Sequence, residues 1–133
     1  SAVVNCRILP GEPVDEVRNT LVRVLASDKI KVTPMGEAVL SPPAPLDERI
    51  LGPVKTIASE MWPGVPLVPT MSAGATDSRF LNSLGIPSYG INGLFNNLET
   101  SGAHAMNERL PVRSLYDGQV FLYRLTKALA GGK

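Results

Sequence analysis

The sequence predicts an α/β fold in which short strands alternate with amphipathic helices. Residues 3–9 alternate in side-chain type with a period of two, which is typical of a strand. Residues 14–25 and 111–130 instead carry apolar side chains at helical spacing. The 12 glycines and 12 prolines among 133 residues favour several short elements joined by turns. Strands separated by helices indicate a layered α/β architecture rather than a helical bundle or a β-sandwich.

The first 34 residues predict a strand–helix–strand unit. Pro10-Gly11 ends the first strand, and Pro13 suits the first turn of the helix that follows. The apolar stripe of this helix consists of Val14, Val17, Leu21, Val24 and Leu25. Residues 30–33 then predict a second short strand, which Pro34 closes.

A proline-rich linker is predicted at residues 41–45, Ser-Pro-Pro-Ala-Pro. Tandem prolines resist both helix and central strand, and they favour an extended backbone. The linker therefore divides the chain into a first piece, residues 1–40, and a second piece, residues 46–133.

The second piece predicts three helices and two strands. The helices are expected at residues 46–61 with a kink or restart at Gly52-Pro53, at 78–84 before Gly85, and at 111–130. Apolar residues cover much of the circumference of the last helix, so we expect it to be largely buried. The strands are expected at residues 65–68 and 86–91.

Composition excludes several classes of function. The formal net charge is +1, which gives no electrostatic case for a nucleic-acid partner or an anionic membrane surface. The apolar runs are too short to cross a membrane, and no signal-like segment opens the chain. One cysteine excludes an internal disulfide, and one histidine excludes a site built from several imidazoles of this chain alone. Because the chain begins at Ser1 rather than methionine, we expect it to be processed or cut from a longer protein, and its localisation stays unknown.

The single histidine, His104, lies among small residues shortly before the last predicted helix. A neutral imidazole is the commonest nitrogen ligand of zinc and a common general base. The alternative is a surface histidine with no role, and the residues taken alone favour that alternative.

Two other segments carry candidate binding chemistry. Residues 72–77 could present backbone N–H groups and the Thr76 hydroxyl to an anion, or they could only allow close packing while Asp77 caps the next helix. Arg7 could clamp a carboxylate from the middle of a strand, or it could lie on a solvated face. Cys6 alternates with apolar neighbours and is expected to be a small core residue.

Three segments, in this order, resemble a known family of enzymes. Residues 4–11 resemble a strand ending in the lid domain of the aminoacylase / carboxypeptidase S family of dinuclear zinc metallopeptidases, whose relatives include acetylornithine deacetylase and succinyl-diaminopimelate desuccinylase. Residues 72–80 are similar to the Gly-Gly-Thr-Asp-type loop of that family, with Ala75 in place of a usual glycine. Residues 104–108, His-Ala-Met-Asn-Glu, are similar to its His-x-x-Asn-Glu element. The resemblance covers nearly the whole chain.

The resemblance implies the C-terminal part of a larger enzyme. Residues 1–40 would be the second half, strand–helix–strand, of an α+β lid or dimerisation domain. Residues 46–133 would be the C-terminal part of a zinc-peptidase-like α/β catalytic domain, with 41–45 as the crossing between the two. The implied partners are the N-terminal part of the same enzyme and a second copy bound through the lid.

The resemblance also implies a chemistry. The family uses two zinc ions and a glutamate base to hydrolyse an amide bond. His104 is implied to be a zinc ligand, with Asn107 and Glu108 supporting its loop. The residues implied to bind the substrate carboxylate are Arg7, Gly74, Ala75 and Thr76. The other zinc ligands and the catalytic residues of the family are absent, and they are expected upstream of Ser1.

Three hypotheses follow from these patterns. The first is a C-terminal fragment of a zinc-dependent metallopeptidase or amidohydrolase that is inactive alone. The parent enzyme would cleave an amide next to a free carboxylate, in an N-acyl amino acid or at a C-terminal peptide bond. The second hypothesis is a small non-catalytic α/β module that binds a partner or dimerises. The third is a family member that kept its fold and lost its metal.

Overall fold

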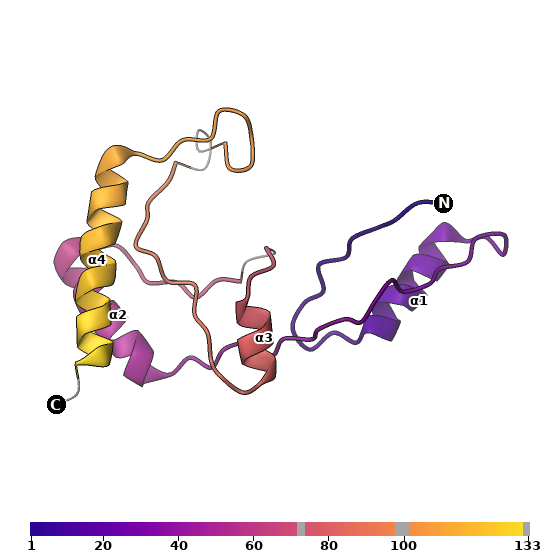
Figure 1. Cartoon of the computed structure of the whole chain (residues 1–133), viewed down its shortest axis with the longest axis horizontal. Coiled ribbons are helices and arrows are strands. Elements are labelled where there is room, and N and C mark those ends of the chain that lie inside the picture. Colours follow the sequence, from indigo (N-terminus) through magenta and orange to yellow (C-terminus); the bar gives the residue numbers. More distant parts are fainter. Residues whose placement is uncertain (72–73, 98–101, 132–133) are drawn as a thin grey trace. The chain divides into compact units, whose positions relative to one another are not determined.

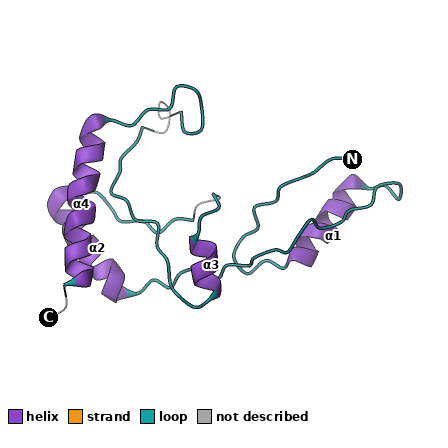
Figure 2. Cartoon of the chain, in the orientation of Figure 1, coloured by secondary structure: helices purple, strands orange, loops and turns teal. Residues whose placement is uncertain are grey.

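The computed structural model describes residues 1–71, 74–97 and 102–131. In these ranges the chain forms four helices: α1 (Val14–Leu25), α2 (Glu48–Met61), α3 (Ser78–Ser83) and α4 (Val112–Ala130) (Figure 1). The same ranges contain no strand (Figure 2). The predicted α/β fold, with its strand–helix–strand lid half, is therefore wrong for the described residues, whose regular elements are all helices.

The four predicted strands fail for a common reason. A strand exists only where its backbone N–H and C=O groups pair with those of a neighbouring strand, whereas a helix makes its hydrogen bonds within one segment. The segments predicted as strands are residues 3–9, 30–33, 65–68 and 86–91. Their backbone hydrogen bonds are local, such as the bond from Glu12 N–H to the Leu9 carbonyl, and none of those found in the described ranges joins one segment to another.

Helix α1 lies where the sequence predicts it. Pro13 precedes it with an extended backbone, Asp15 and Glu16 occupy the first turn, and Arg23 occupies the last turn. These charges match the helix dipole. The helix ends at Ala26, which has a left-handed backbone (φ 47°) and donates its N–H to the Val22 carbonyl.

Helix α2 is capped by a carboxylate. The Asp47 side chain accepts a hydrogen bond from the Arg49 backbone N–H at 2.9 Å and also contacts the Arg49 guanidinium. These hydrogen bonds from Arg49 lower the pKa of the Asp47 carboxyl. The helix runs through Pro53 as one element, so it does not restart at Gly52-Pro53, and the alternative of a kink there stays a prediction.

Helices α3 and α4 are predicted in place, but not in all details. Asp77 occupies the N-cap position of α3, yet its side chain makes no capping hydrogen bond. Gly85 follows α3 with a left-handed backbone (φ 78°), as expected for a terminating glycine. In α4 the buried side is a narrow stripe rather than most of the circumference. Its buried residues are Ser114, Gly118, Phe121 and Leu125.

By contacts, the described chain forms two compact units. Unit 1 consists of Ser1–Pro45 and Thr70–Tyr89, and unit 2 consists of Leu46–Pro69 and Gly90–Lys133. The predicted domains, residues 1–40 and 46–133 with a linker at 41–45, concern a larger protein and stay a prediction.

Unit 2 holds the hydrophobic core, where α2 packs against α4. The buried core residues are Val54, Ile57, Phe121 and Leu125, with Trp62 and Ile91 packed against them. The Trp62 ring lies 5.3 Å from the Phe121 ring and 4.8 Å from the Phe95 ring. An ion pair between Arg124 and Glu60 also joins the two helices.

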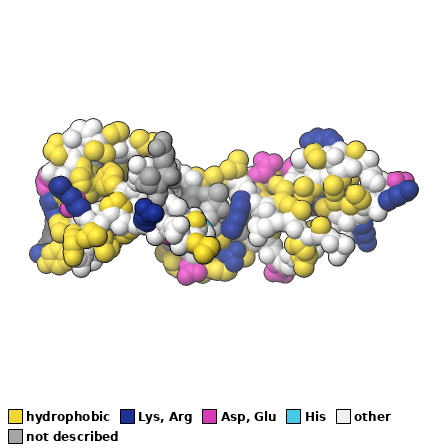
Figure 3. Space-filling view, turned by 90° about the horizontal axis from the view of Figure 1, so that it is seen from above, with side chains coloured by type: hydrophobic (Ala, Val, Ile, Leu, Met, Phe, Trp, Pro, Cys, Tyr) yellow, Lys and Arg dark blue, Asp and Glu magenta, His cyan; other side chains and the backbone are white. Residues whose placement is uncertain are grey.

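Unit 1 has no buried side chain among its described residues. Val3 is 75% exposed, Val24 is 73% exposed and Met35 is 78% exposed. Cys6 is also exposed, so its predicted place in a core is wrong. Figure 3 shows apolar side chains spread over the molecular surface.

Candidate functional site

The loop that carries His104 folds as two successive turns in unit 2. The Ala105 N–H donates to the Gly102 carbonyl at 2.8 Å, and the Glu108 N–H donates to the Ala105 carbonyl at 3.2 Å. The Glu108 carboxylate then accepts a hydrogen bond from the His104 N–H at 3.3 Å. The loop therefore closes on itself around His104.

His104 has an unusual backbone conformation. Its φ of 64° lies in the left-handed region, which a residue other than glycine adopts at a cost of about 1 kcal/mol. Its side chain is exposed, and no hydrogen bond or ion pair joins the imidazole to another described residue. Strained backbone conformations cluster at functional sites, which makes His104 a candidate site residue.

The segment that leads toward this loop is fixed to α4. The Ser114 hydroxyl, which is 7% exposed, accepts a hydrogen bond from the Phe95 N–H at 2.6 Å. At Gly118 the backbone of the segment comes close, because a Cβ there would lie 3.2 Å from the Asn92 carbonyl oxygen. Neither position was predicted from the sequence. The signal that could have found them is two small residues four apart on the stripe that continues to Phe121.

The residues predicted to bind the substrate carboxylate all lie in unit 1. Arg7 is exposed on a segment without secondary structure, and no hydrogen bond or ion pair joins it to another described residue. Gly74, Ala75 and Thr76 are exposed and directly precede Asp77 and α3. Ser72 and Ala73, at the start of the predicted loop, lie outside the described residues.

The structure thus groups the predicted residues by segment. His104, Asn107 and Glu108 come together in one closed loop. Among the described residues, no hydrogen bond or ion pair joins Arg7 to Ala75 or Thr76.

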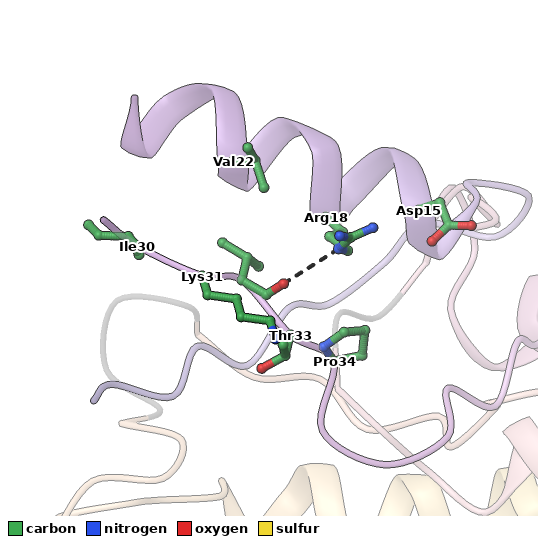
Figure 4. Close-up of a pocket in the computed structure, with 8 residues that line it drawn as sticks. Asp15, Arg18, Val22, Ile30, Lys31, Thr33 and Pro34 are labelled. Atoms are coloured by element: carbon green, nitrogen blue, oxygen red, sulfur yellow. Dashed lines mark hydrogen bonds between the residues drawn. The ribbon is translucent and has the colours of Figure 1, made fainter. Parts of the chain in front are cut away.

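A shallow hollow beside α1 is a feature that the sequence analysis did not single out (Figure 4). Asp15 and Arg18 line it from α1, and Lys31 and Thr33 line it from the segment after the helix. The Arg18 Nε donates to the Val32 carbonyl at 3.5 Å, which holds this segment near the helix.

Comparison with protein families decides the class of protein. The family model described as "Peptidase family M20/M25/M40" matches residues 1–128, almost the whole chain. The chain belongs to peptidase family M20/M25/M40. The predicted resemblance to zinc metallopeptidases is thereby confirmed at the level of the family.

Two curated M20 relatives are similar to this chain. The human N-fatty-acyl-amino acid synthase/hydrolase PM20D1 is 30% identical over 129 residues, which are 93% of this chain and 26% of the relative. The mouse protein of the same name is 31% identical over 124 residues, which are 90% of this chain and 24% of the relative. The chain thus spans about a quarter of the length of these relatives. No solved structure matches the chain.

The M20 family is typically zinc-dependent, so the residues of this chain can be tested against a zinc site. Zinc in proteins takes about four ligands, three or four of them from side chains. Among the described residues no group of three or more His, Cys, Asp or Glu side chains is placed to hold a metal ion. The described residues therefore do not form a zinc site by themselves, and His104 could supply one ligand of such a site.

No helix in the described ranges is long and apolar enough to cross a membrane.

Proposed function

We propose that this chain is the C-terminal part of a zinc-dependent amidohydrolase that cleaves the amide bond of an N-acyl amino acid, next to a free carboxylate. Membership of the M20 family supports the class of enzyme. The printed name of the human relative, an N-fatty-acyl-amino acid synthase/hydrolase, favours an N-acyl amino acid over a C-terminal peptide bond. The single observation that carries the proposal in this chain is His104, whose imidazole is exposed on a strained and closed loop.

Each predicted site residue receives a role in this proposal. His104 is one ligand of a dinuclear zinc centre, and the other ligands and the general base come from the rest of the protein. Arg7 and the loop Gly74, Ala75 and Thr76 hold the substrate carboxylate, for which a guanidinium and backbone N–H groups are suitable donors. Asn107 and Glu108 support the His104 loop.

The apolar surface of unit 1 supports the part of the proposal that concerns partners. None of the described side chains between residues 1 and 45 is buried, and this segment has several valines and leucines at the surface. A stand-alone binding module would be expected to bury such side chains in its own core. We therefore favour the fragment over the non-catalytic module, with the remainder of the enzyme, and a second copy bound through the lid, as the partners that cover this surface.

The proposal is tested with the full-length protein and the 133-residue chain, both supplied with zinc. We expect the full-length protein to hydrolyse an N-acyl amino acid and the isolated chain to release no product. His104→Asn in the full-length protein should abolish hydrolysis without lowering the unfolding midpoint, because asparagine tolerates a left-handed backbone. Hydrolysis by the isolated chain, or unchanged activity of His104→Asn, would contradict the assignment.

The role of Arg7 has its own test. Loss of a hydrogen bond to a charged group weakens binding affinity by about ten- to hundredfold. Arg7→Ala should therefore raise KM for the free acid by that factor. The methyl ester of the same substrate lacks the carboxylate, so Arg7→Ala should change its KM little. Arg23→Ala, an exposed arginine on α1, is the matched control. Equal effects of Arg7→Ala on acid and ester would refute carboxylate binding.

A further inference from the structure

We infer that Glu108 and Gly102 are positioning residues, which lock the loop 102–108 in one closed conformation and fix His104 through its backbone. The inference deepens the proposed function, on which it rests for what His104 binds. The conformation of the loop itself is independent of that function.

Packing of side chains does not hold the loop 102–108 closed. Its side chains make no apolar core, since Met106 is fully exposed and Ala103, His104 and Ala105 are exposed as well. A loop without buried apolar contacts is expected to open easily unless local hydrogen bonds hold it. Its order must therefore come from the backbone and from the few side chains that bond to the backbone.

The side chain of Glu108 bonds to the backbone of His104. Its carboxylate reaches back four residues and accepts the His104 N–H at 3.3 Å. The Glu108 N–H is itself bound to the Ala105 carbonyl, so the acceptor is anchored at its own backbone. This bond satisfies the amide of the residue that has the left-handed φ, and it joins Glu108 to the backbone of His104 rather than to the imidazole. Glu108 therefore fixes the backbone of His104, and with it the direction of the side chain, without bonding to the imidazole ring.

Gly102, at the other end of the loop, has a left-handed backbone. Its φ is 58°, a value that favours glycine. A Cβ at this position would lie 3.3 Å from the Asn107 carbonyl oxygen and 3.6 Å from the Glu108 Cα. A side chain at position 102 would therefore be crowded by the backbone of residues 107 and 108, so glycine fits the closed loop best. Glycine at 102 and glutamate at 108 thus favour the closed loop in two independent ways.

The experiment measures amide hydrogen exchange of His104 by NMR in the full chain at constant pH. Glu108→Ala should speed exchange of the His104 N–H by about fivefold, the loss expected for one exposed hydrogen bond. Glu108→Gln retains an acceptor oxygen and should restore most of the protection. Gly102→Ala should speed exchange at the same amide without removing any acceptor. Glu37→Ala, an exposed glutamate in unit 1, should leave it unchanged.

Exchange at Leu125, in the core of unit 2, shows whether each variant remains folded. If Glu108→Ala unfolds this core, Gly102→Ala decides the question, and if Gly102→Ala unfolds it, Glu108→Ala decides the question. Unchanged His104 exchange in folded Glu108→Ala, or no rescue by Glu108→Gln, would overturn the inference. In the full-length protein, Glu108→Ala should lower kcat for an N-acyl amino acid more than it raises KM. Absence of any hydrolysis by the unmodified protein would refute the proposed function and leave the exchange result valid.

Discussion

The Ser114 hydroxyl accepts the Phe95 backbone N–H at 2.6 Å from inside the packed face of α4. This bond ties an irregular segment to a helix and brings the Phe95 ring to 4.8 Å from Trp62. Because this hydrogen bond is partly buried, loss of the acceptor destabilises the fold by about 1–3 kcal/mol. We therefore predict that Ser114→Ala lowers the free energy of unfolding of unit 2 by that amount.

Fluorescence of Trp62 during urea unfolding measures this effect, since Trp62 is the single tryptophan and contacts both Phe95 and Phe121. Ser59→Ala, on the exposed side of α2, is the control and should change the unfolding free energy by less than about 0.5 kcal/mol. An equal effect of the two variants would refute the role of Ser114.

Gly118→Ala should destabilise unit 2 although it places a better helix former within α4. In an open helix the replacement of glycine by alanine stabilises by about 1 kcal/mol. Here the new Cβ would lie 2.5 Å from a methyl group of Leu94 and 3.2 Å from the Asn92 carbonyl oxygen. We expect a net loss of about 1–3 kcal/mol in the same urea experiment, because the backbone of the segment must move. Gln119→Ala, on the exposed side of α4, should be neutral or slightly stabilising, and a stabilised Gly118→Ala would contradict the close approach.

The Asp47 cap should make α2 sensitive to acid. Hydrogen bonds from Arg49 lower the pKa of the Asp47 carboxyl in the folded chain below its value in the unfolded chain. The stabilisation is therefore complete above the ordinary aspartate pKa of about 3.9, and it is lost as the pH falls through the lower folded value. Asp47→Asn keeps a capping oxygen and should remove this component of the pH dependence, measured by far-UV circular dichroism.

Glu48→Gln is the control for this prediction, because Glu48 pairs with Lys55 on the same helix and does not cap it. This variant should keep the Asp47 component of the acid transition. Identical acid transitions of Asp47→Asn and the unmodified chain would show that the Asp47 cap does not contribute to the pH dependence of α2 stability.

Ala26→Gly should stabilise α1. Ala26 ends the helix with a φ of 47° and a ψ of 38°, a conformation that glycine adopts without the steric cost of a Cβ. We expect a gain of about 1 kcal/mol, seen as slower amide exchange within α1. Ala38→Gly, at an exposed loop position of unit 1, should leave α1 unchanged. Faster exchange of the α1 amides in Ala26→Gly would contradict the left-handed cap.

The sequence by itself located all four helices and the family. A helix satisfies its backbone within one segment, so Pro13 with its following acids, the apolar spacing of α2, and Gly85 after α3 are sufficient signals. The His104 loop was also found from the sequence, because its His-x-x-Asn-Glu spacing lies within five residues. The strands were predicted wrongly, because a strand depends on a partner that its own sequence does not specify.

Only the tertiary structure decided which side of α4 is buried and how His104 is held. Ser114 and Gly118 face the core although neither is apolar and large, because the backbone of residues 92–95 approaches α4 at these two positions. The sequence also does not predict the left-handed φ of His104 or the hydrogen bond from the His104 N–H to the Glu108 carboxylate. Periodicity indicates the hydrogen bonds and the apolar face of a regular element. It does not indicate where a distant segment packs closely against a helix, nor which side chain returns to the backbone of an irregular loop.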